Sequence, residues 1–388
     1  MKIAIDVRRI HSFGIGTYIR DLLNALAQAD SGDQYVLAAA PADMKLLEHL
    51  PGNFHTVPYG RTDEDGLDHF AFPMFLRDLR ADLVHIPLNR VPLLMPRPYV
   101  VTIHDMSSLL YEEAPGPMRH FRKYRFRRGL LRANRVIVVS AATQRDIQNL
   151  LHVPEERIRL VYSAPDPQFF APEASAQERR RILERYQIHY PFLLYAGTIR
   201  PQKNIPRLVE AFAVVRTELQ SHPVYKDLRL IIIGDEISKY PAVRRAVIQS
   251  RVENCVRFLG FVPFDTMRIF YGLAAAFVFP SLYEGFGLPP LEAMASGTPV
   301  VCSNVSSLPE AVGDAAALVN PENVFDISRA IKQVLLNETF RAELIRRGRK
   351  RAASFSWEKT AREVIDIYNE VAGKSRKKVR QAVSPADS

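Results

Sequence analysis

The chain has 388 residues, of which 47% are hydrophobic and 24% are charged, and this length favours two domains over one core. Its composition is typical of a soluble globular protein, and no apolar run approaches the roughly 20 residues of a membrane-spanning helix. The two cysteines, Cys255 and Cys302, are too few for a disulfide framework. We therefore expect a folded protein of a reducing, cytoplasmic compartment.

The net charge of +10 comes from 52 Lys and Arg against 42 Asp and Glu. Much of the excess is local, because the segment 119–135 holds eight Lys or Arg and no acid, and 374–380 holds five. Such charge permits nucleic acid, anionic lipid or a phosphorylated substrate as a partner. We expect no nucleic-acid partner, because the basic segments contain no recognition motif such as a zinc module.

Short apolar runs of strand type alternate with helical patterns along the first half of the chain. The clearest helical patterns span 16–29 and 143–153. Seven runs are predicted as strands, at 2–7, 34–39, 54–59, 83–87, 99–104, 135–140 and 157–162.

Pro, Ala and Ser interrupt the alternation at 163–178, which we interpret as the seam between two domains. Six further strands are then predicted, at 191–197, 228–234, 256–261, 275–281, 298–304 and 316–320. A last helix is predicted at 357–371. We predict an N-terminal domain at 1–165 and a C-terminal domain at 166–355. A helical segment at 356–373 and a disordered basic tail at 374–388 follow them.

The alternation of helices with mostly apolar strands is typical of parallel sheets covered on both faces. We therefore predict an α/β fold with two Rossmann-like parallel-sheet domains that face each other across a cleft. Ligands of such sheets lie beyond the carboxyl ends of the strands. The residues that follow the predicted strands are thus the candidates for a binding site.

Two such places lie in the first domain. Gly14 and Gly16 stand in a turn between the first strand and the first helix, where a phosphate would bind. The third glycine of a dinucleotide-binding fingerprint is missing, because that position is Ile19. A tight turn without a ligand therefore explains the two glycines equally well. His104 and Asp105 end an apolar strand, where a histidine serves either as a structural hydrogen-bonding group or as a ligand contact. No spacing of His and Cys predicts a metal site.

The second domain offers a cationic loop, AGTIRPQKN at 196–204, directly after its first strand. Arg200 and Lys203 precede a helix, and two cations beside a helix N-terminus suit a diphosphate. The plainer alternative is a solvated loop with ordinary surface charges.

The most specific pattern is EGFGLPPLE, residues 284–292. If Pro289 or Pro290 takes the first helical position, Glu292 falls in the first helical turn, and the helix N-terminus forms an anion site. Carboxylates on both sides of an anion site, Glu284 and Glu292, suit a ligand with hydroxyls on both sides of its phosphates. A nucleotide sugar is such a ligand.

With these motifs the chain resembles the retaining glycosyltransferases of family 4, which have the GT-B fold. The similarity covers most of the chain and rests on GIGTY, HD, AGTIRPQKN, FLGFVP and above all the glutamate pair, which corresponds to the family's E-x7-E motif. The opening segment and the KN ending of the cationic loop resemble the mannosyl- and rhamnosyltransferase branch.

The resemblance implies roles for single residues of this sequence. In the cleft, Gly14 and Gly16 would approach the diphosphate, His104 would touch the transferred sugar, Lys203 would bind the diphosphate and Glu284 would contact the donor sugar. It also implies a nucleotide-sugar domain at 166–355, an acceptor domain at 1–165, and a final helix that returns to brace the acceptor domain.

On the nucleotide side, Gly287 and Leu288 would give N–H groups to phosphate, and Glu292 would hold the ribose hydroxyls. Phe261 and Val262 would lie by the base. Many members carry an arginine where this chain has Thr198 or Gln202, so Arg200 would supply that charge from a different place in the loop.

The resemblance thus implies a retaining glycosyltransferase without a metal or other cofactor, which moves a hexose, foremost mannose from GDP-mannose, to a glycan or lipid-linked acceptor. Alternatives are a UDP-, ADP- or dTDP-sugar donor, a sugar-nucleotide hydrolase or epimerase, and a non-catalytic sugar-nucleotide-binding protein. The basic segment 119–135 is either a solvated helix face or a contact with anionic lipid or a pyrophosphate-bearing acceptor. The lipid contact would place the protein peripherally at the inner membrane face.

Overall fold

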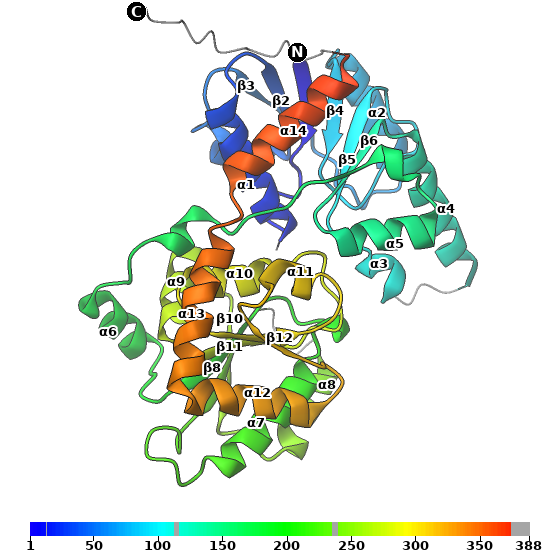
Figure 1. Cartoon of the computed structure of the whole chain (residues 1–388). Helices are drawn as coiled ribbons and strands as arrows, with labels where there is room; N and C mark the ends of the chain where they lie inside the picture. Colours follow the sequence, from blue (N-terminus) through cyan, green and yellow to red (C-terminus); the bar gives the residue numbers. More distant parts are fainter. Residues whose placement is uncertain (13, 112–115, 235–239, 374–388) are drawn as a thin grey trace, which may run out of the picture.

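The computed structural model describes residues 1–12, 14–111, 116–234 and 240–373, which form two α/β domains (Figure 1). The predicted basic tail, 374–388, lies outside the described residues. All seven strands predicted in the first half and all six in the second are present, as two parallel sheets. The predicted fold class is therefore confirmed.

The N-terminal sheet has the strand order β3-β2-β1-β4-β5-β6-β7. Its central strands β4 and β5 are buried along their whole length, because helices cover both faces of a parallel sheet. The strands are β1 Lys2–Asp6, β2 Gln34–Ala39, β3 Phe54–Pro58, β4 Leu83–Ile86, β5 Tyr99–Ile103, β6 Arg135–Val138 and β7 Ile158–Leu160. The helices are α1 Ile15–Ala29, α2 Asp68–Asp78, α3 Ser107–Leu110, α4 Gly116–Arg132 and α5 Ala141–Leu151, with the 3-10 helices η1 Pro41–Leu47 and η2 Glu155–Arg157.

The C-terminal sheet has the order β10-β9-β8-β11-β12-β13. Its strands are β8 Phe192–Ala196, β9 Arg229–Ile233, β10 Val256–Gly260, β11 Ala276–Phe279, β12 Val300–Ser303 and β13 Ala317–Val319. Its helices are α6 Ala176–Arg185, α7 Ile205–Glu218, α8 Pro241–Gln249, α9 Phe264–Leu273, α10 Leu288–Ala295, α11 Leu308–Val312, α12 Val324–Leu336 and α13 Glu338–Ala352, with the 3-10 helices η3 Pro167–Phe170 and η4 Pro201–Lys203.

The order of strands reverses between β1 and β4 in the first sheet, and between β8 and β11 in the second. Such switch points open a crevice at the carboxyl ends of the strands. The loops after β1, β4, β5, β8 and β11 are therefore the ones placed to bind a ligand, and they include most of the predicted site residues.

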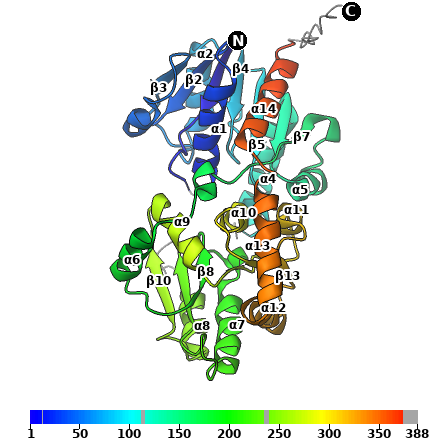
Figure 2. The ribbon, with the colours of Figure 1, turned by 60° about the vertical axis from the view of Figure 1, so that its left-hand side comes forward.

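The chain passes between the domains twice, once after β7 and once between α13 and α14 (Trp357–Val371), and α14 packs against α1 of the N-terminal domain (Figures 1 and 2). The hydroxyl of Tyr368 in α14 lies 2.6 Å from Nδ1 of the buried His85 in β4. Thr360 Oγ1 donates to the Tyr162 carbonyl at 2.7 Å. The last helix thus joins the first sheet through specific polar contacts.

No helix in the described ranges has both the length and the apolar character needed to cross a bilayer.

Candidate active site

The cationic loop after β8 is tied to its neighbours by its last residue. Asn204 adopts a left-handed conformation (φ 59°) at the start of α7, and its buried side chain donates to the carbonyls of Pro280 at 3.0 Å and Pro321 at 2.7 Å. The Leu282 N–H donates to the Gln202 carbonyl at 2.7 Å. These bonds hold the loop against the segment that follows β11, which carries Glu284.

Lys203 and Glu284 meet at this junction. Lys203 Nζ lies 2.6 Å from Glu284 Oε1, and 16% and 10% of the two side chains are exposed. Since both are largely buried, solvent screens their attraction less than it screens a surface ion pair. The structure thus brings the cation predicted for a diphosphate into contact with the carboxylate predicted for a sugar.

Two serines hold the backbone around Glu284, and the sequence reading missed both. Ser306 Oγ donates to the Glu284 carbonyl at 2.7 Å, and Ser307 Oγ donates to the Phe286 carbonyl at 2.8 Å. A serine pair before a helix indicates a cap in the sequence, and nothing in the spacing shows that it clamps a loop twenty residues earlier. These two hydrogen bonds fix the backbone position from which the Glu284 side chain extends.

Helix α10 begins at Leu288, directly after Gly287, whose φ of 125° suits glycine. The predicted position of Glu292 is wrong: it is the fifth residue of the helix, and no acid lies in the first turn. The reason is that Gly287 starts the helix ahead of Pro289 and Pro290. Because those prolines have no N–H, the N–H groups of Gly287 and Leu288 are the ones that this end of α10 can offer an anion.

Glu292 lies in a partly buried, carboxyl-rich region. Its Oε2 accepts a hydrogen bond from the Tyr271 hydroxyl at 3.0 Å, and burial, with a smaller effect from Asp166, raises its pKa to about 7. Burial raises the pKa of Asp21, on α1, to about 8, and the charges of Asp166 and Glu292 add to this effect. Residues from α1, the interdomain link and α10 therefore share one electrostatic environment, which the sequence did not indicate.

His104 follows β5 and faces its own domain with one ring nitrogen. Its Nε2 lies 3.0 Å from the Pro87 carbonyl, so this nitrogen carries a proton, and its backbone N–H donates to Asn89 Oδ1 at 2.9 Å. Burial lowers its pKa. The ring is therefore neutral at physiological pH, with Nδ1 as an acceptor.

Glycines allow backbone segments to approach each other closely around the candidate site. A Cβ at Gly285 would collide with the carbonyl oxygen of His104 from the other domain, and a Cβ at Gly16 would collide with the Ile10 carbonyl. Gly14 (φ 71°) precedes α1 as its N-cap. The predicted glycine turn therefore lets the start of α1 approach the end of the loop that follows β1.

Two further contacts between the domains were not predicted. The Tyr283 hydroxyl donates to Asp146 Oδ2 at 2.7 Å and accepts from the Met106 N–H at 3.1 Å. Glu310 accepts from the Ala141 N–H at 2.8 Å, at the first residue of α5. A carboxylate of the C-terminal domain thus caps a helix of the N-terminal domain.

A cavity of about 620 Å³ lies between the domains. Thr198, Arg200, Gln202 and Lys203 form its wall in the C-terminal domain. The opposite wall comes from the loops after β1, β3, β4 and β5 and from helices α1, α2, α3 and α4. Within the described ranges, the lining does not include the other predicted residues: Gly14, Gly16, His104, Phe261, Val262, Glu284, Gly287, Leu288 and Glu292.

The predicted base-binding pair lies after β10. The Phe261 side chain is 74% exposed and Val262 is 4% exposed. Phe261 therefore offers a ring face to solvent, whereas Val262 can meet a ligand only through its backbone. In the part of the chain that the structure describes, no group of three His, Cys, Asp or Glu is arranged to hold a metal ion.

Comparison with known proteins identifies both halves of the chain. Residues 14–169 match the family model "Glycosyltransferase Family 4", and residues 178–351 match "Glycosyl transferases group 1". An O-antigen chain mannosyltransferase B from Escherichia coli is 34% identical over 295 residues, which cover 76% of this chain and 75% of the relative. The serotype-specific mannosyltransferase WbdA of the same species is 31% identical over 76% of this chain, which spans 35% of that longer protein.

Among solved structures, a sucrose-phosphate synthase from Thermosynechococcus elongatus superposes with a TM-score of 0.77 over 97% of this chain and 100% of that one. Its identity of 22% shows the shared fold. Together with the family matches, this establishes that the chain is a glycosyltransferase of family 4 with the GT-B fold.

Proposed function

We propose that this glycosyltransferase transfers mannose from GDP-mannose to a hydroxyl of a glycan or lipid-linked glycan, with retention of configuration and without a metal ion. The observation that carries the proposal is the contact between Lys203 and Glu284 at the edge of the interdomain cavity. A cation and a carboxylate side by side match a ligand whose diphosphate adjoins a sugar. The names of the mannosyltransferase relatives favour mannose over glucose.

In this proposal the donor lies along the C-terminal domain. Glu292 accepts from the ribose hydroxyls, while Phe261 adjoins the base. The N–H groups of Gly287 and Leu288 bind the diphosphate at the positive end of α10. Each of these groups lies at or beyond the carboxyl end of a strand, as the ligand sites of such sheets do.

The transfer step breaks the bond between the anomeric carbon and the diphosphate oxygen and forms a bond to the acceptor oxygen on the same face. The acceptor hydroxyl gives its proton to the departing phosphate oxygen, so no covalent enzyme intermediate is needed. Lys203 and Arg200 stabilise the negative charge that develops on the diphosphate. With these cations and the α10 N–H groups supplying that stabilisation, we propose that no metal is required.

Glu284 and His104 act by positioning the donor sugar. The Glu284 carboxylate, fixed by its backbone clamp and by Lys203, accepts from sugar hydroxyls. The neutral His104 offers its remaining ring nitrogen, since Nε2 is occupied by the Pro87 carbonyl. Neither residue is consumed in the reaction.

Thermal-shift measurements with sugar nucleotides test the donor directly, because a ligand at 100 times its Kd stabilises by about 2.7 kcal/mol. GDP and GDP-mannose should raise the Tm more than UDP-, ADP- and dTDP-sugars at equal concentration. A larger shift with UDP-glucose would overturn the donor assignment and leave the family intact. Turnover that is lost in EDTA and restored by manganese would contradict metal independence. Binding of a sugar nucleotide without any turnover would favour a non-catalytic sugar-nucleotide sensor.

The outer face of α4 favours a further contact, with the cytoplasmic surface of a membrane. Phe121 and Tyr124 are 52% and 57% exposed, and Lys123 and Arg128 are exposed beside them. Aromatic and cationic side chains together suit an anionic lipid surface. The protein should sediment with anionic vesicles at low salt and be released as salt rises; equal recovery with neutral vesicles would contradict this contact.

A further inference from the structure

The N-terminal wall of the interdomain cavity holds basic side chains that the proposed donor site does not use. His69 at the start of α2, Arg90 in the loop after β4, and Arg125 on α4 all line it. Gly129, one turn after Arg125, lets α4 pack tightly there, because a Cβ at this position would lie 2.7 Å from the Cβ of Val91. This packing places Arg125 beside the loop that carries Arg90.

The carboxylates of the same cavity are already engaged. Arg9 forms ion pairs with Asp63 at 2.7 Å and with Glu64 at 2.8 Å. Asp105 accepts from the Ser107 N–H at 2.9 Å and from the Ser107 hydroxyl at 2.7 Å. None of these three acids forms an ion pair with Arg90 or Arg125.

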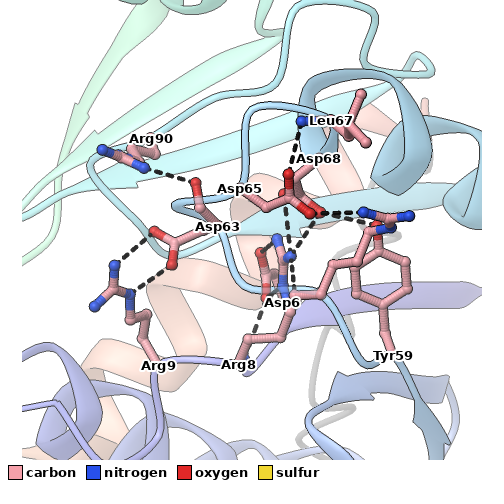
Figure 3. Close-up of polar contacts among 10 residues, drawn as sticks. Asp6, Arg8, Arg9, Tyr59, Asp63, Asp65, Leu67, Asp68 and Arg90 are labelled. Carbon is pink, nitrogen blue, oxygen red and sulfur yellow. Dashed lines mark hydrogen bonds and ion pairs between the residues drawn. The ribbon is translucent and has the colours of Figure 1, made fainter.

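Arg90 itself donates only to a backbone oxygen, the Asp63 carbonyl, at 2.7 Å, as Figure 3 shows beside the Arg9–Asp63 pair. The Arg125 guanidinium lies 5.9 Å from the Phe121 ring. In the described part of the chain, neither arginine forms an ion pair, and His69 Nδ1 is a buried nitrogen without a hydrogen-bond partner. The cavity wall thus carries two arginines that form no ion pair with a described residue, together with a histidine nitrogen that has no hydrogen-bond partner.

The three residues also influence one another electrostatically. Burial lowers the pKa of Arg125, and the positive charges of Arg90 and Arg122 lower it further. Burial likewise lowers the pKa of His69, Arg125 and Arg90 add to that effect, and Asp68 opposes it. Like charges gathered in a partly buried site cost folding free energy, which an anionic ligand would offset.

We propose that His69, Arg90 and Arg125 form a phosphate subsite for the acceptor, which therefore carries a phosphate or diphosphate group near the hydroxyl that receives the sugar. The proposal rests on the function proposed above, because it takes the donor diphosphate to lie at Lys203 on the other wall and at the N–H groups of α10 beyond it. A nucleotide sugar has one diphosphate, so a second anion site in the same cavity belongs to the second substrate. Arginine guanidinium groups suit phosphate oxygens through paired hydrogen bonds.

The test uses the full chain saturated with GDP, so that the donor site is filled, and inorganic diphosphate as the probe at constant ionic strength. Isothermal titration should show one binding site. The double variant Arg90→Gln/Arg125→Gln should weaken diphosphate binding tenfold or more. The matched control, Arg180→Gln/Arg181→Gln, removes two exposed charges from helix α6 of the C-terminal domain, outside the cavity lining, and should leave binding unchanged.

Farnesyl diphosphate, titrated in parallel, distinguishes the source of the phosphate. Tighter binding than inorganic diphosphate indicates a lipid-linked acceptor, and equal binding indicates a phosphorylated sugar. No binding of diphosphate to the GDP-loaded chain, or equal weakening by the control variant, would overturn the subsite. Failure of GDP itself to bind would instead count against the proposed function. Unchanged GDP affinity in the Arg90→Gln/Arg125→Gln variant would show that the substitutions leave the donor site intact.

Discussion

The ammonium of Lys203 lies 2.6 Å from the carboxylate of Glu284, although 81 residues separate them in the sequence. The two side chains come from the loops after β8 and β11, the strands between which the order of the C-terminal sheet reverses. A switch point of this kind gathers chemistry from distant segments at one sheet edge. The proposed function depends on what this pair holds.

Glu292 is expected to act in binding more than in turnover. Glu292→Ala should weaken GDP by about 1.5–3 kcal/mol, the scale of a hydrogen bond to a charged group. The KM for the donor should rise more than kcat falls, as for an interaction made equally in the ground and transition states. Titration calorimetry and steady-state kinetics measure both quantities, and an unchanged GDP affinity would remove Glu292 from the ribose site.

Gly285 should not tolerate a side chain, because a Cβ there would collide with the His104 carbonyl of the facing domain. Gly285→Ala should therefore shift the two domains relative to each other and lower kcat/KM by about 10²-fold, the scale of a 1 Å misplacement of catalytic groups. GDP affinity should change little, since the nucleotide is proposed to lie along the C-terminal domain.

The matched control for Gly285→Ala is Gly272→Ala in helix α9, where the only neighbouring atom among the described residues is the Ser296 carbonyl at 4.0 Å. Gly272→Ala should leave kinetics unchanged and raise stability slightly, because alanine favours a helix interior. Equal kinetics for the two variants would show that the close approach at Gly285 has no part in catalysis.

Glu310 should stabilise the pairing of the domains, because its carboxylate accepts from the Ala141 N–H at 2.8 Å and from the Tyr162 hydroxyl at 2.7 Å. Glu310→Ala should lower the free energy of unfolding by about 1–2 kcal/mol, the cost of a lost helix cap. Urea unfolding measures this, with Glu253→Ala, at an exposed carboxylate, as the control. Equal effects from both substitutions would contradict a capping role.

Asp21 should make stability depend on pH. Burial and the neighbouring Asp166 raise its pKa from 3.8 to about 8, so the folded chain holds a proton that the unfolded chain releases. The stability that this proton contributes is complete below the unfolded pKa and is lost as pH rises through about 8. Asp21→Asn cannot ionise, so the free energy of unfolding of the wild type should fall relative to the variant between pH 4 and pH 8. Parallel pH profiles in urea unfolding would show that Asp21 is ionised throughout.

Local pattern was enough to predict every strand of both sheets, because buried parallel strands are short apolar runs set between turn signals. The same pattern predicted that Lys203 and Glu284 lie in the loops that follow two of these strands, as they do. It placed Glu292 one or two residues too early in α10, because the backbone freedom of Gly287 decides where this helix begins.

Contacts between distant segments had no sequence signal. Ser306 and Ser307 bond to the Glu284 loop, and Glu310 caps a helix of the other domain, through geometry that only the assembled fold creates. The basic segment 119–135 likewise divides between two environments: Arg125 lines the interdomain cavity, whereas Arg128, less than one turn further along α4, is exposed. Charge counted along a sequence does not tell which side chains reach a cavity.

The most direct test of the central claim separates sugar transfer from nucleotide binding at Glu284. Glu284→Gln keeps the size of the side chain and removes the charge that pairs with Lys203 and that is proposed to position the sugar. GDP release from GDP-mannose and titration with GDP should be measured on this variant and on the wild type. If Glu284 positions the sugar as proposed, kcat should fall by about 10²-fold or more while the Kd for GDP stays close to that of the wild type, because GDP lacks that sugar. Near-normal turnover in Glu284→Gln would contradict this role, and would make the Lys203–Glu284 pair a structural contact.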